Sequence, residues 1–198
     1  FPILLVIFYI AVFIHRCLFR TPKKLLILDL NNFLIHRVFK HKIPDEAKDY
    51  IPTADVLNNH YVWKRPQLEE FIEYCMQNFT VAIWSSAQEQ NVDLLCGYIF
   101  TTLNRSKLLF EWNQSNCNAV SPHPNSDKNC PLFEKNLTDV WDTFTLYNAE
   151  NTLILDDSNL KMRNNSEECV GIADKWTIWD SDNVETLDTV VQWLEERK

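Results

Sequence analysis

The sequence predicts an α/β protein built on a doubly wound parallel sheet. Short apolar runs at 25–30, 80–84 and 151–155 are typical of strands that are buried on both faces of a parallel sheet. Amphipathic segments at 66–78 and 88–101 alternate with these runs, as in chains whose parallel strands are joined by helices. Polar residues mark the end of each run, and open α/β sheets bind their ligands at the carboxyl ends of the strands.

The helices are predicted from apolar residues that recur at helical spacing. Pro66 suits the first turn of one helix, and Asp182 and Glu185 form a capping box for a last helix over 183–197. The predicted buried faces are Leu68, Phe71, Ile72 and Cys75; Val92, Leu95, Cys96 and Ile99; and Val184, Leu187, Val191 and Leu194. The remaining segments are predicted as strands at 108–112, 170–172 and 177–179, a helix that begins near Leu132 or Leu137, a long loop or small β flap over 37–62, and a polar surface loop over 113–131.

The composition is that of one folded domain. The 198 residues are 46% hydrophobic, which supplies enough apolar surface for a core and excludes intrinsic disorder. The net charge of −8 argues against a general nucleic-acid binder, because binding to phosphates needs a basic excess. The chain has 2 Gly but 19 Asn, so we expect Asn to occupy turn positions that Gly usually takes.

The six cysteines do not form a metal or redox motif, because no two of them have C-x-x-C spacing. Cys75 and Cys96 lie in apolar stretches and are predicted to be core residues. Cys117 and Cys130 flank a polar loop, where they either pair or remain free thiols. Nothing in the spacing indicates a disulfide framework, which favours a reducing compartment.

Residues 1–14 are entirely apolar, and four basic side chains follow within 15–24. About 20 apolar residues span a bilayer, and basic residues flank the cytoplasmic end of membrane helices. We therefore predict that residues 1–14 belong to a truncated membrane anchor. A hydrophobic helix packed on the domain and the remnant of a signal or transit peptide are the alternatives. The expected division is a hydrophobic segment over 1–20 and a folded domain over 21–198.

Acidic residues at two strand ends point to a cation site. Asp29 ends the first apolar run, Ser85 ends the second, and the pair Asp156-Asp157 ends the run over 151–155. Two adjacent carboxylates at a buried sheet edge repel each other and need a cation nearby. Mg²⁺ binds through oxygen ligands and is the usual hard partner of such groups, so the sequence predicts a Mg²⁺ cofactor.

The segment Leu26–His36 resembles the first motif of haloacid-dehalogenase-superfamily (HAD) phosphatases. More narrowly, it is similar to the TFIIF-associating C-terminal-domain phosphatases, also called the NLI-interacting-factor-like family. The other matching segments, in the order and at the spacings of the family, are Lys64-Arg65-Pro66, Val81–Ala87, Lys135-Asn136-Leu137 and Leu153–Ser158. The resemblance covers about residues 23–195 and implies a HAD-like Rossmannoid fold with a small β flap after the first strand.

The resemblance implies catalysis through an aspartyl-phosphate. Asp29 would attack a phosphate monoester, and Mg²⁺ would be held by Asp29, the backbone carbonyl of Asn31 and Asp157. Ser85 and Lys135 would hold the phosphate oxygens. Asp156 would have a supporting role, orienting the lysine or a metal-bound water. The substrates that the family implies are phosphoproteins carrying phosphoserine or phosphothreonine.

The chain departs from the family at the second Asp of the Asp-x-Asp motif, where it has Asn31. In the family this second carboxyl is the general acid and base, and an amide cannot transfer a proton at neutral pH. General acid–base catalysis is typically worth ~10²–10⁴-fold. Phe33 also replaces the usual Thr, and we expect it to crowd the loop. The sequence therefore leaves open whether this chain is an active enzyme.

Two functions from different classes remain. The first is an impaired Mg²⁺-dependent protein phosphatase held at a membrane, as in the Dullard-type phosphatases of the nuclear envelope and endoplasmic reticulum. The second is an inactive phosphatase fold that binds a protein partner, as in a presequence-receptor subunit of the mitochondrial inner-membrane translocase. The predicted location is a membrane facing the cytoplasm or nucleus; the mitochondrial inner membrane and a soluble nuclear location are the alternatives.

Overall fold

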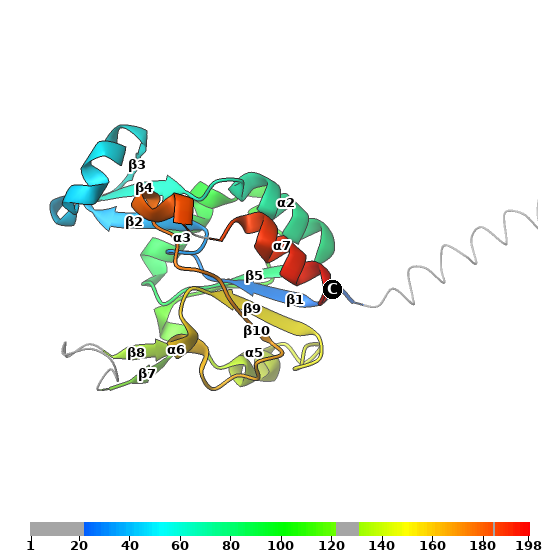
Figure 1. Ribbon diagram of the computed structural model, residues 1–198. Helices are drawn as coiled ribbons and strands as arrows, with labels where there is room; N and C mark the ends of the chain where they lie inside the picture. Colours follow the sequence, from blue (N-terminus) through cyan, green and yellow to red (C-terminus); the bar gives the residue numbers. More distant parts are fainter. Residues whose placement is uncertain (1–21, 122–130, 184) are drawn as a thin grey trace, which may run out of the picture.

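The computed structural model describes residues 22–121, 131–183 and 185–198. A five-stranded parallel sheet in the order β10-β9-β1-β5-β6 forms its centre (Figure 1). The strands are β1 (Leu25–Leu28), β5 (Thr80–Trp84), β6 (Glu111–Trp112), β9 (Thr152–Asp156) and β10 (Val170–Ile172). The prediction of an α/β fold with a parallel sheet is confirmed.

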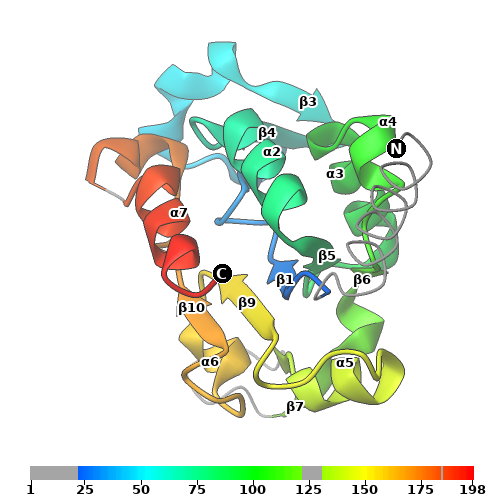
Figure 2. The same cartoon turned by 90° about the vertical axis from the view of Figure 1, so that its right-hand side faces the viewer.

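Helices cover both faces of this sheet. The longer ones, α2 (Leu68–Asn78), α3 (Glu89–Ile99) and α7 (Leu187–Glu195), pack on one face, and α5 (Leu137–Thr143) and α6 (Asn159–Met162) pack on the other. Figure 2 shows α5 on the opposite side of the sheet from α2. A short helix, α4 (Thr102–Arg105), follows α3. The two-sided cover explains why the central strands are apolar at nearly every position.

Strand β1 is the centre of the core. It pairs with β5 on one side and with β9 on the other, and each of its four side chains is fully buried. Successive side chains of a strand point to opposite faces, so Leu26 and Leu28 pack under α2, α3 and α7, whereas Leu25 and Ile27 pack under α5 and α6. The carboxyl end of β1 is thereby held rigidly at the sheet edge.

The small β flap after the first strand is an antiparallel sheet in the order β2-β4-β3. It contains β2 (Ile35–Phe39), β3 (Asp55–Leu57), β4 (His60–Lys64) and the 3₁₀ helices η1 (Lys40–Lys42) and η2 (Asp45–Thr53). A second antiparallel pair, β7 (Asn118–Val120) and β8 (Leu132–Glu134), lies near α5. The 3₁₀ helices η3 (Gln114–Asn116) and η4 (Ile178–Asn183) complete the described elements.

Of the two predicted starts for the helix near residue 135, Leu137 is correct, because residues 132–134 form strand β8 and pair with β7. Two other sequence predictions about local structure are wrong. Residues 177–179 form no strand, since the sheet ends at β10 and this segment turns into η4. Helix α7 begins at Leu187 with Thr186 as its N-cap residue, so Asp182 and Glu185 do not form its capping box.

The cysteines agree with the sequence prediction where the structure describes them. Cys75 and Cys96 are fully buried, and burial raises the pKa of both thiols. Cys117 is a free thiol, and Cys130 lies outside the described residues. Neither Cys75 nor Cys96 is therefore a reactive thiolate at neutral pH.

The predicted anchor, residues 1–14, lies outside the described residues, as does the rest of the segment 1–20. Within residues 22–121, 131–183 and 185–198, every helix is too short or too polar to cross a membrane. The anchor, the domain division at residue 20 and the cellular location therefore stay predictions.

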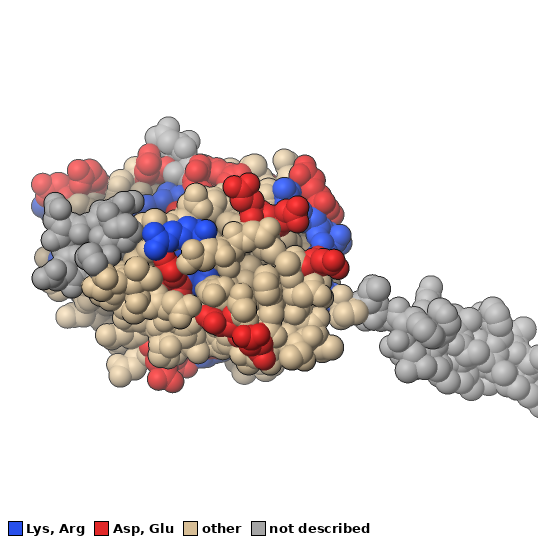
Figure 3. All heavy atoms as spheres, turned by 90° about the horizontal axis from the view of Figure 1, so that it is seen from below, with Lys and Arg blue, Asp and Glu red and all other residues tan. Residues whose placement is uncertain are grey.

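Charged side chains at the surface form several separate groups. On the face shown in Figure 3, acidic groups lie apart from one another and basic side chains lie beside some of them. One surface network joins Arg105 Nη2 to Asp93 Oδ1 and Glu111 Oε2, each at 2.7 Å. Exposed ion pairs contribute roughly 0–1 kcal/mol each, so the buried ion pairs described below matter far more for the fold.

The two glycines of the chain give opposite predictions for stability. A Cβ at Gly171 would lie 2.3 Å from Leu155 Cδ2 and 3.0 Å from Trp193 Cη2, inside the contact between β10, β9 and α7. We expect Gly171→Ala to lower the free energy of unfolding by about 1–3 kcal/mol. A Cβ at Gly97, in α3, meets only the flexible end of Arg105 at 3.4 Å, so Gly97→Ala should raise stability by about 0.5–1 kcal/mol.

Urea unfolding followed by circular dichroism measures both glycine variants against the unaltered chain. Gly97→Ala is the matched control, because it adds the same methyl group at a position with space for it. Equal stability of Gly171→Ala and the unaltered chain would contradict the close packing of β10 on β9.

Candidate active site

Three carboxylates meet at the carboxyl ends of β1 and β9. Asp29 directly follows β1, Asp156 ends β9, and the register of the two strands places Leu28 opposite Leu155. Asp29, Asp156 and Asp157 each offer an oxygen within 4.8 Å of the others. Asp29 is 1% exposed and Asp156 is completely buried, so both charges need partners inside the protein.

Lys135 is the buried partner of two of these carboxylates. Its ammonium Nζ donates to Asp29 Oδ1 at 2.8 Å and to Asp156 Oδ2 at 2.5 Å. The lysine lies between β8 and α5, and its backbone is fixed on both sides: its N–H donates to Lys161 O at 2.8 Å, and its carbonyl accepts from Asn165 Nδ2 at 2.7 Å. Burial alone would lower the pKa of Lys135, but the carboxylates of Asp156 and Asp29 outweigh burial and raise it.

A second lysine, Lys161, reaches the same cluster from α6. Its Nζ lies 3.2 Å from Asp156 Oδ1 and 3.3 Å from Asp157 Oδ1. Burial would lower the pKa of Lys161, and the charges of Asp29, Asp156 and Asp157 raise it instead. Sequence reasoning missed this residue; the i, i+4 spacing from Asp157 was the available signal.

Among the described residues, the cluster has one negative charge in excess, because three carboxylates face two ammonium groups. Asp156 lies between both lysines; burial acts to raise its pKa, but Lys135 and Lys161 lower it overall. In the part of the chain that the structure describes, Asp157 pairs with one ammonium group, that of Lys161, and burial together with the charges of Asp156 and Asp29 raises the pKa of Asp157 to about 6. Oxygen donors with an uncompensated negative charge are what a hard divalent cation binds.

The loop after Asp29 is shaped by two asparagines. Asn32 has a φ of 62°, a left-handed conformation that Asn tolerates better than most residues. Its Nδ2 donates to Asp157 Oδ2 at 3.4 Å, and its Oδ1 lies 3.1 Å from His36 Nδ1. Asn31 Oδ1 is buried, and within the described residues it has no hydrogen-bond partner. Sequence reasoning singled out Asn31 but missed Asn32.

His36 contacts this loop through Asn32 and packs against aromatic side chains. Its ring lies 4.6 Å from that of Trp179 and 5.9 Å from that of Trp63, measured between centroids. Burial first, and then the charge of Lys175, lowers the pKa of His36 to about 4. The imidazole is therefore neutral at physiological pH, and Nδ1–H can donate to Asn32 Oδ1.

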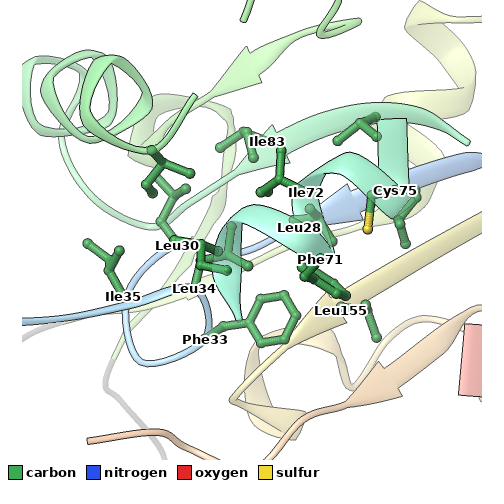
Figure 4. Packing of buried hydrophobic residues seen from close by; sticks show 14 of the residues in the cluster. Leu28, Leu30, Phe33, Leu34, Ile35, Phe71, Ile72, Cys75, Ile83 and Leu155 are labelled. Carbon is green, nitrogen blue, oxygen red and sulfur yellow. The ribbon is translucent and has the colours of Figure 1, made fainter. Parts of the chain in front are cut away.

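Phe33 does not crowd the loop, contrary to the sequence expectation. The side chain is fully buried, and its ring meets the ring of Phe71 edge to face at 6.0 Å. Figure 4 shows the ring among core residues, next to Phe71 and Leu155. Arg65 holds the backbone of the same loop: its guanidinium donates to Phe33 O at 3.1 Å and also to Glu185 O.

Ser85 lies at the same sheet edge, at the carboxyl end of β5. The pairing of Leu28 with Ile83 places Ser85 just beyond the level of Asp29. The side chain is buried, and its Oγ accepts a hydrogen bond from Ala87 N at 3.3 Å. In the described structure this hydroxyl bonds within its own turn, and no hydrogen bond joins it to the carboxylate cluster.

The raised pKa of Asp157 gives a prediction for stability against pH. The folded-state pKa of about 6 exceeds the ordinary value of 3.8, so the ionised carboxylate destabilises the fold above pH 6. This destabilisation fades as the pH falls from about 6 to about 4. In EDTA at pH 7.5, Asp157→Asn should raise the free energy of unfolding by on the order of 1–2 kcal/mol.

Urea unfolding at pH 7.5, 6 and 4.5 measures this difference. The gain should shrink toward zero at the lowest pH. Asp142→Asn, at an exposed carboxyl of α5, is the control and should stay within about 0.5 kcal/mol of the unaltered chain at each pH. A loss of stability in Asp157→Asn at pH 7.5 would contradict the excess of negative charge.

Comparison with known proteins identifies relatives of this chain. An uncharacterised FCP1 homology domain-containing protein of Schizosaccharomyces pombe is 25% identical over 164 residues, which are 77% of this chain and 61% of that protein. A putative CTD phosphatase-like protein of Invertebrate iridescent virus 3 is 29% identical over 93 residues, 44% of this chain and 50% of that protein. Phosphatase PSR1 of Saccharomyces cerevisiae is 34% identical over 79 residues, 40% of this chain and 18% of that protein. The chain thus spans about three-fifths or less of these relatives.

The fold is similar to that of Fcp1, described as an essential RNA polymerase II CTD phosphatase. The TM-score is 0.55 at 13% sequence identity, over 95% of this chain and 53% of that one. The family model for NLI interacting factor-like phosphatases matches residues 24–198, which is nearly the whole of the described structure. The chain belongs to the NLI interacting factor-like phosphatase family, within the HAD superfamily.

Proposed function

We propose that this chain is a Mg²⁺-dependent phosphoprotein phosphatase domain whose turnover is slowed by Asn31. The observation that carries the proposal is the cluster of Asp29, Asp156 and Asp157, of which the first two pair with buried Lys135, beside an amide at position 31. The cluster offers a nucleophile, oxygen ligands and a cation for phosphate. The missing part is a group that transfers a proton.

The donor set fits Mg²⁺. Carboxylate and carbonyl oxygens are its preferred ligands, and the cluster has a negative charge that the two lysines leave uncompensated. The carboxylates of Asp29 and Asp157 and the backbone carbonyl of Asn31 would hold the ion. When bound, Mg²⁺ supplies positive charge that neutralises the phosphate as the reaction proceeds.

Asp29 would form the covalent intermediate. One of its carboxylate oxygens bonds to phosphorus while the bond from phosphorus to the serine or threonine oxygen breaks. Lys135 and the Ser85 hydroxyl would hold the phosphate oxygens. Asp156 positions Lys135 for this role, since it accepts from the ammonium at 2.5 Å and remains its partner while the bond to Asp29 is exchanged.

The proton balance of this step depends on residue 31. The departing serine oxygen needs a proton, and later a water molecule must lose one to attack the aspartyl-phosphate. The amide of Asn31 can donate a hydrogen bond but cannot transfer a proton at neutral pH. Both steps are therefore slow, and the enzyme retains phosphate on Asp29 longer than one with a carboxyl at this position.

Asn31 also favours a second function. If turnover is slow enough, the domain acts as a binding module that recognises a phosphorylated partner and releases it unchanged. The two functions differ in one quantity, the rate of phosphoserine hydrolysis relative to binding. Phosphoserine hydrolysis by the unaltered chain therefore distinguishes the two functions, and Asn31→Asp tests whether residue 31 sets its rate.

We expect the unaltered chain to hydrolyse aryl phosphates weakly and phosphoserine peptides hardly at all, in the presence of Mg²⁺. A phenolate leaves without a proton more easily than a serine alkoxide, which explains the difference. Asn31→Asp should raise phosphoserine turnover by on the order of 10²-fold or more, the size of a restored general acid. Release of inorganic phosphate measures both reactions.

Asp29→Asn is the control, and it should abolish turnover of both substrates and any phosphoryl adduct seen by mass spectrometry. Because Phe33 packs in the core, it should not limit the rescue by Asn31→Asp. Fast phosphoserine turnover by the unaltered chain, lost in Asp29→Asn, would show that another group transfers the proton. The binding-module function would then be rejected.

A further inference from the structure

Lys161 places a positive charge of the protein beside a proposed metal ligand. Its Nζ lies 3.3 Å from Asp157 Oδ1 and 3.2 Å from Asp156 Oδ1. The Lys161 side chain is 20% exposed, whereas that of Asp157 is 9% exposed and that of Asp156 is 0% exposed. Lys161 is therefore the most exposed side chain of this group of charges.

The backbone holds Lys161 in this place. Its carbonyl accepts from Lys135 N at 2.8 Å, and its own N–H donates to Ser158 O at 3.2 Å. Asp156 is fixed as well, because its Oδ1 accepts from Ser158 N at 2.9 Å. The contact between Lys161 and the cluster is thus built into the turn after β9, unlike an ion pair between two mobile surface side chains.

We infer that Lys161 acts as an internal cation that competes with Mg²⁺ at the cluster of Asp29 and Asp157, an inference that rests on the proposed function. A divalent ion on Asp157 and an ammonium about 3 Å from the same carboxylate would repel each other strongly. Binding of Mg²⁺ therefore requires Lys161 to move out toward solvent, which its partial exposure allows. In the absence of metal, Lys161 compensates the carboxylates and keeps the site folded.

The exchange regulates the site through the concentration of Mg²⁺. Displacement of Lys161 costs free energy, which weakens the binding of Mg²⁺. The site therefore fills at a higher Mg²⁺ concentration than three carboxylates without Lys161 would need. The displaced ammonium also becomes available at the mouth of the site, where a phosphorylated substrate arrives.

Titration of Mg²⁺ into the unaltered chain and Lys161→Gln, followed by isothermal titration calorimetry and thermal unfolding, tests the inference. Gln keeps most of the length and hydrogen-bonding capacity of Lys but has no charge. We expect Lys161→Gln to bind Mg²⁺ roughly tenfold or more tightly than the unaltered chain. Without metal its Tm should be lower, and saturating Mg²⁺ should raise that Tm by more than it raises the Tm of the unaltered chain.

Lys48→Gln is the matched control. Lys48 lies in η2 of the flap and pairs with Asp45 at 2.5 Å on the surface, with the lysine side chain 59% exposed. This variant loses the same charge and an ion pair, but it should bind Mg²⁺ as the unaltered chain does.

A second measurement needs no variant and decides the question if Lys161→Gln fails to fold. Lysine-selective acylation of the unaltered chain, read by peptide mass spectrometry, reports the accessibility of each ammonium. Saturating Mg²⁺ should increase the labelling of Lys161 several-fold and leave Lys48 unchanged. Unchanged labelling of Lys161 at saturation would overturn the inference.

Equal affinities of Lys161→Gln and the unaltered chain for Mg²⁺ would also overturn it, while the proposed function would stand. Absence of Mg²⁺ binding from every variant would overturn the inference together with the metal requirement of the proposed function. The two failures are therefore distinguishable in one titration.

Discussion

The buried bridge from Lys135 to Asp29 and Asp156 is the interaction on which the rest of this site depends. It joins the ends of β1 and β9 to the segment between β8 and α5, and all three side chains are almost completely removed from solvent. Removing one partner of a buried ion pair typically costs about 3–5 kcal/mol, because the remaining charge is left without compensation. Lys135 is thus needed by the fold before any phosphate arrives, and a loss of activity on replacing it would not by itself show a role in catalysis.

From this bridge, polar contacts extend outward in two directions. In one direction Asp157 meets Asn32, and Asn32 meets the neutral ring of His36, which packs among indole rings. In the other direction Lys161 joins Asp156 and Asp157 from α6. Phe33, from the same loop, is fully buried in the core. The carboxylates are consequently held close together by partners on both sides despite their mutual repulsion.

The sequence predicted the sheet well where a strand is buried on both faces, because such strands are apolar at almost every position. Leu25–Leu28, Thr80–Trp84 and Thr152–Asp156 are examples. It failed at Leu132–Glu134, whose strand character comes from a partner more than ten residues away in a polar segment. The candidate residues Asp29, Asp156 and Asp157 were found from their place at the ends of apolar runs, and Lys135 was found by motif resemblance; the structure brings the four together. Lys161 and Asn32 were missed because their role comes from three-dimensional proximity to the cluster, which spacing alone shows weakly.

Asn31 and Lys161 both reduce the net negative charge of the carboxylate cluster. A carboxyl at position 31 would add a fourth negative charge, and without Lys161 one ammonium would face all of them. Such a cluster would be strongly unfavourable without a divalent ion, because like charges in a buried site raise one another's pKa and destabilise the fold. With the amide and the second lysine in place, the excess falls to one negative charge, and that charge is on Asp157, the least buried of the three carboxylates. Asn31, which lacks the proton that an Asp would donate, therefore also makes the folded cluster less dependent on a divalent ion. A phosphatase site altered in this way can keep its fold and its phosphate-binding groups while its turnover declines.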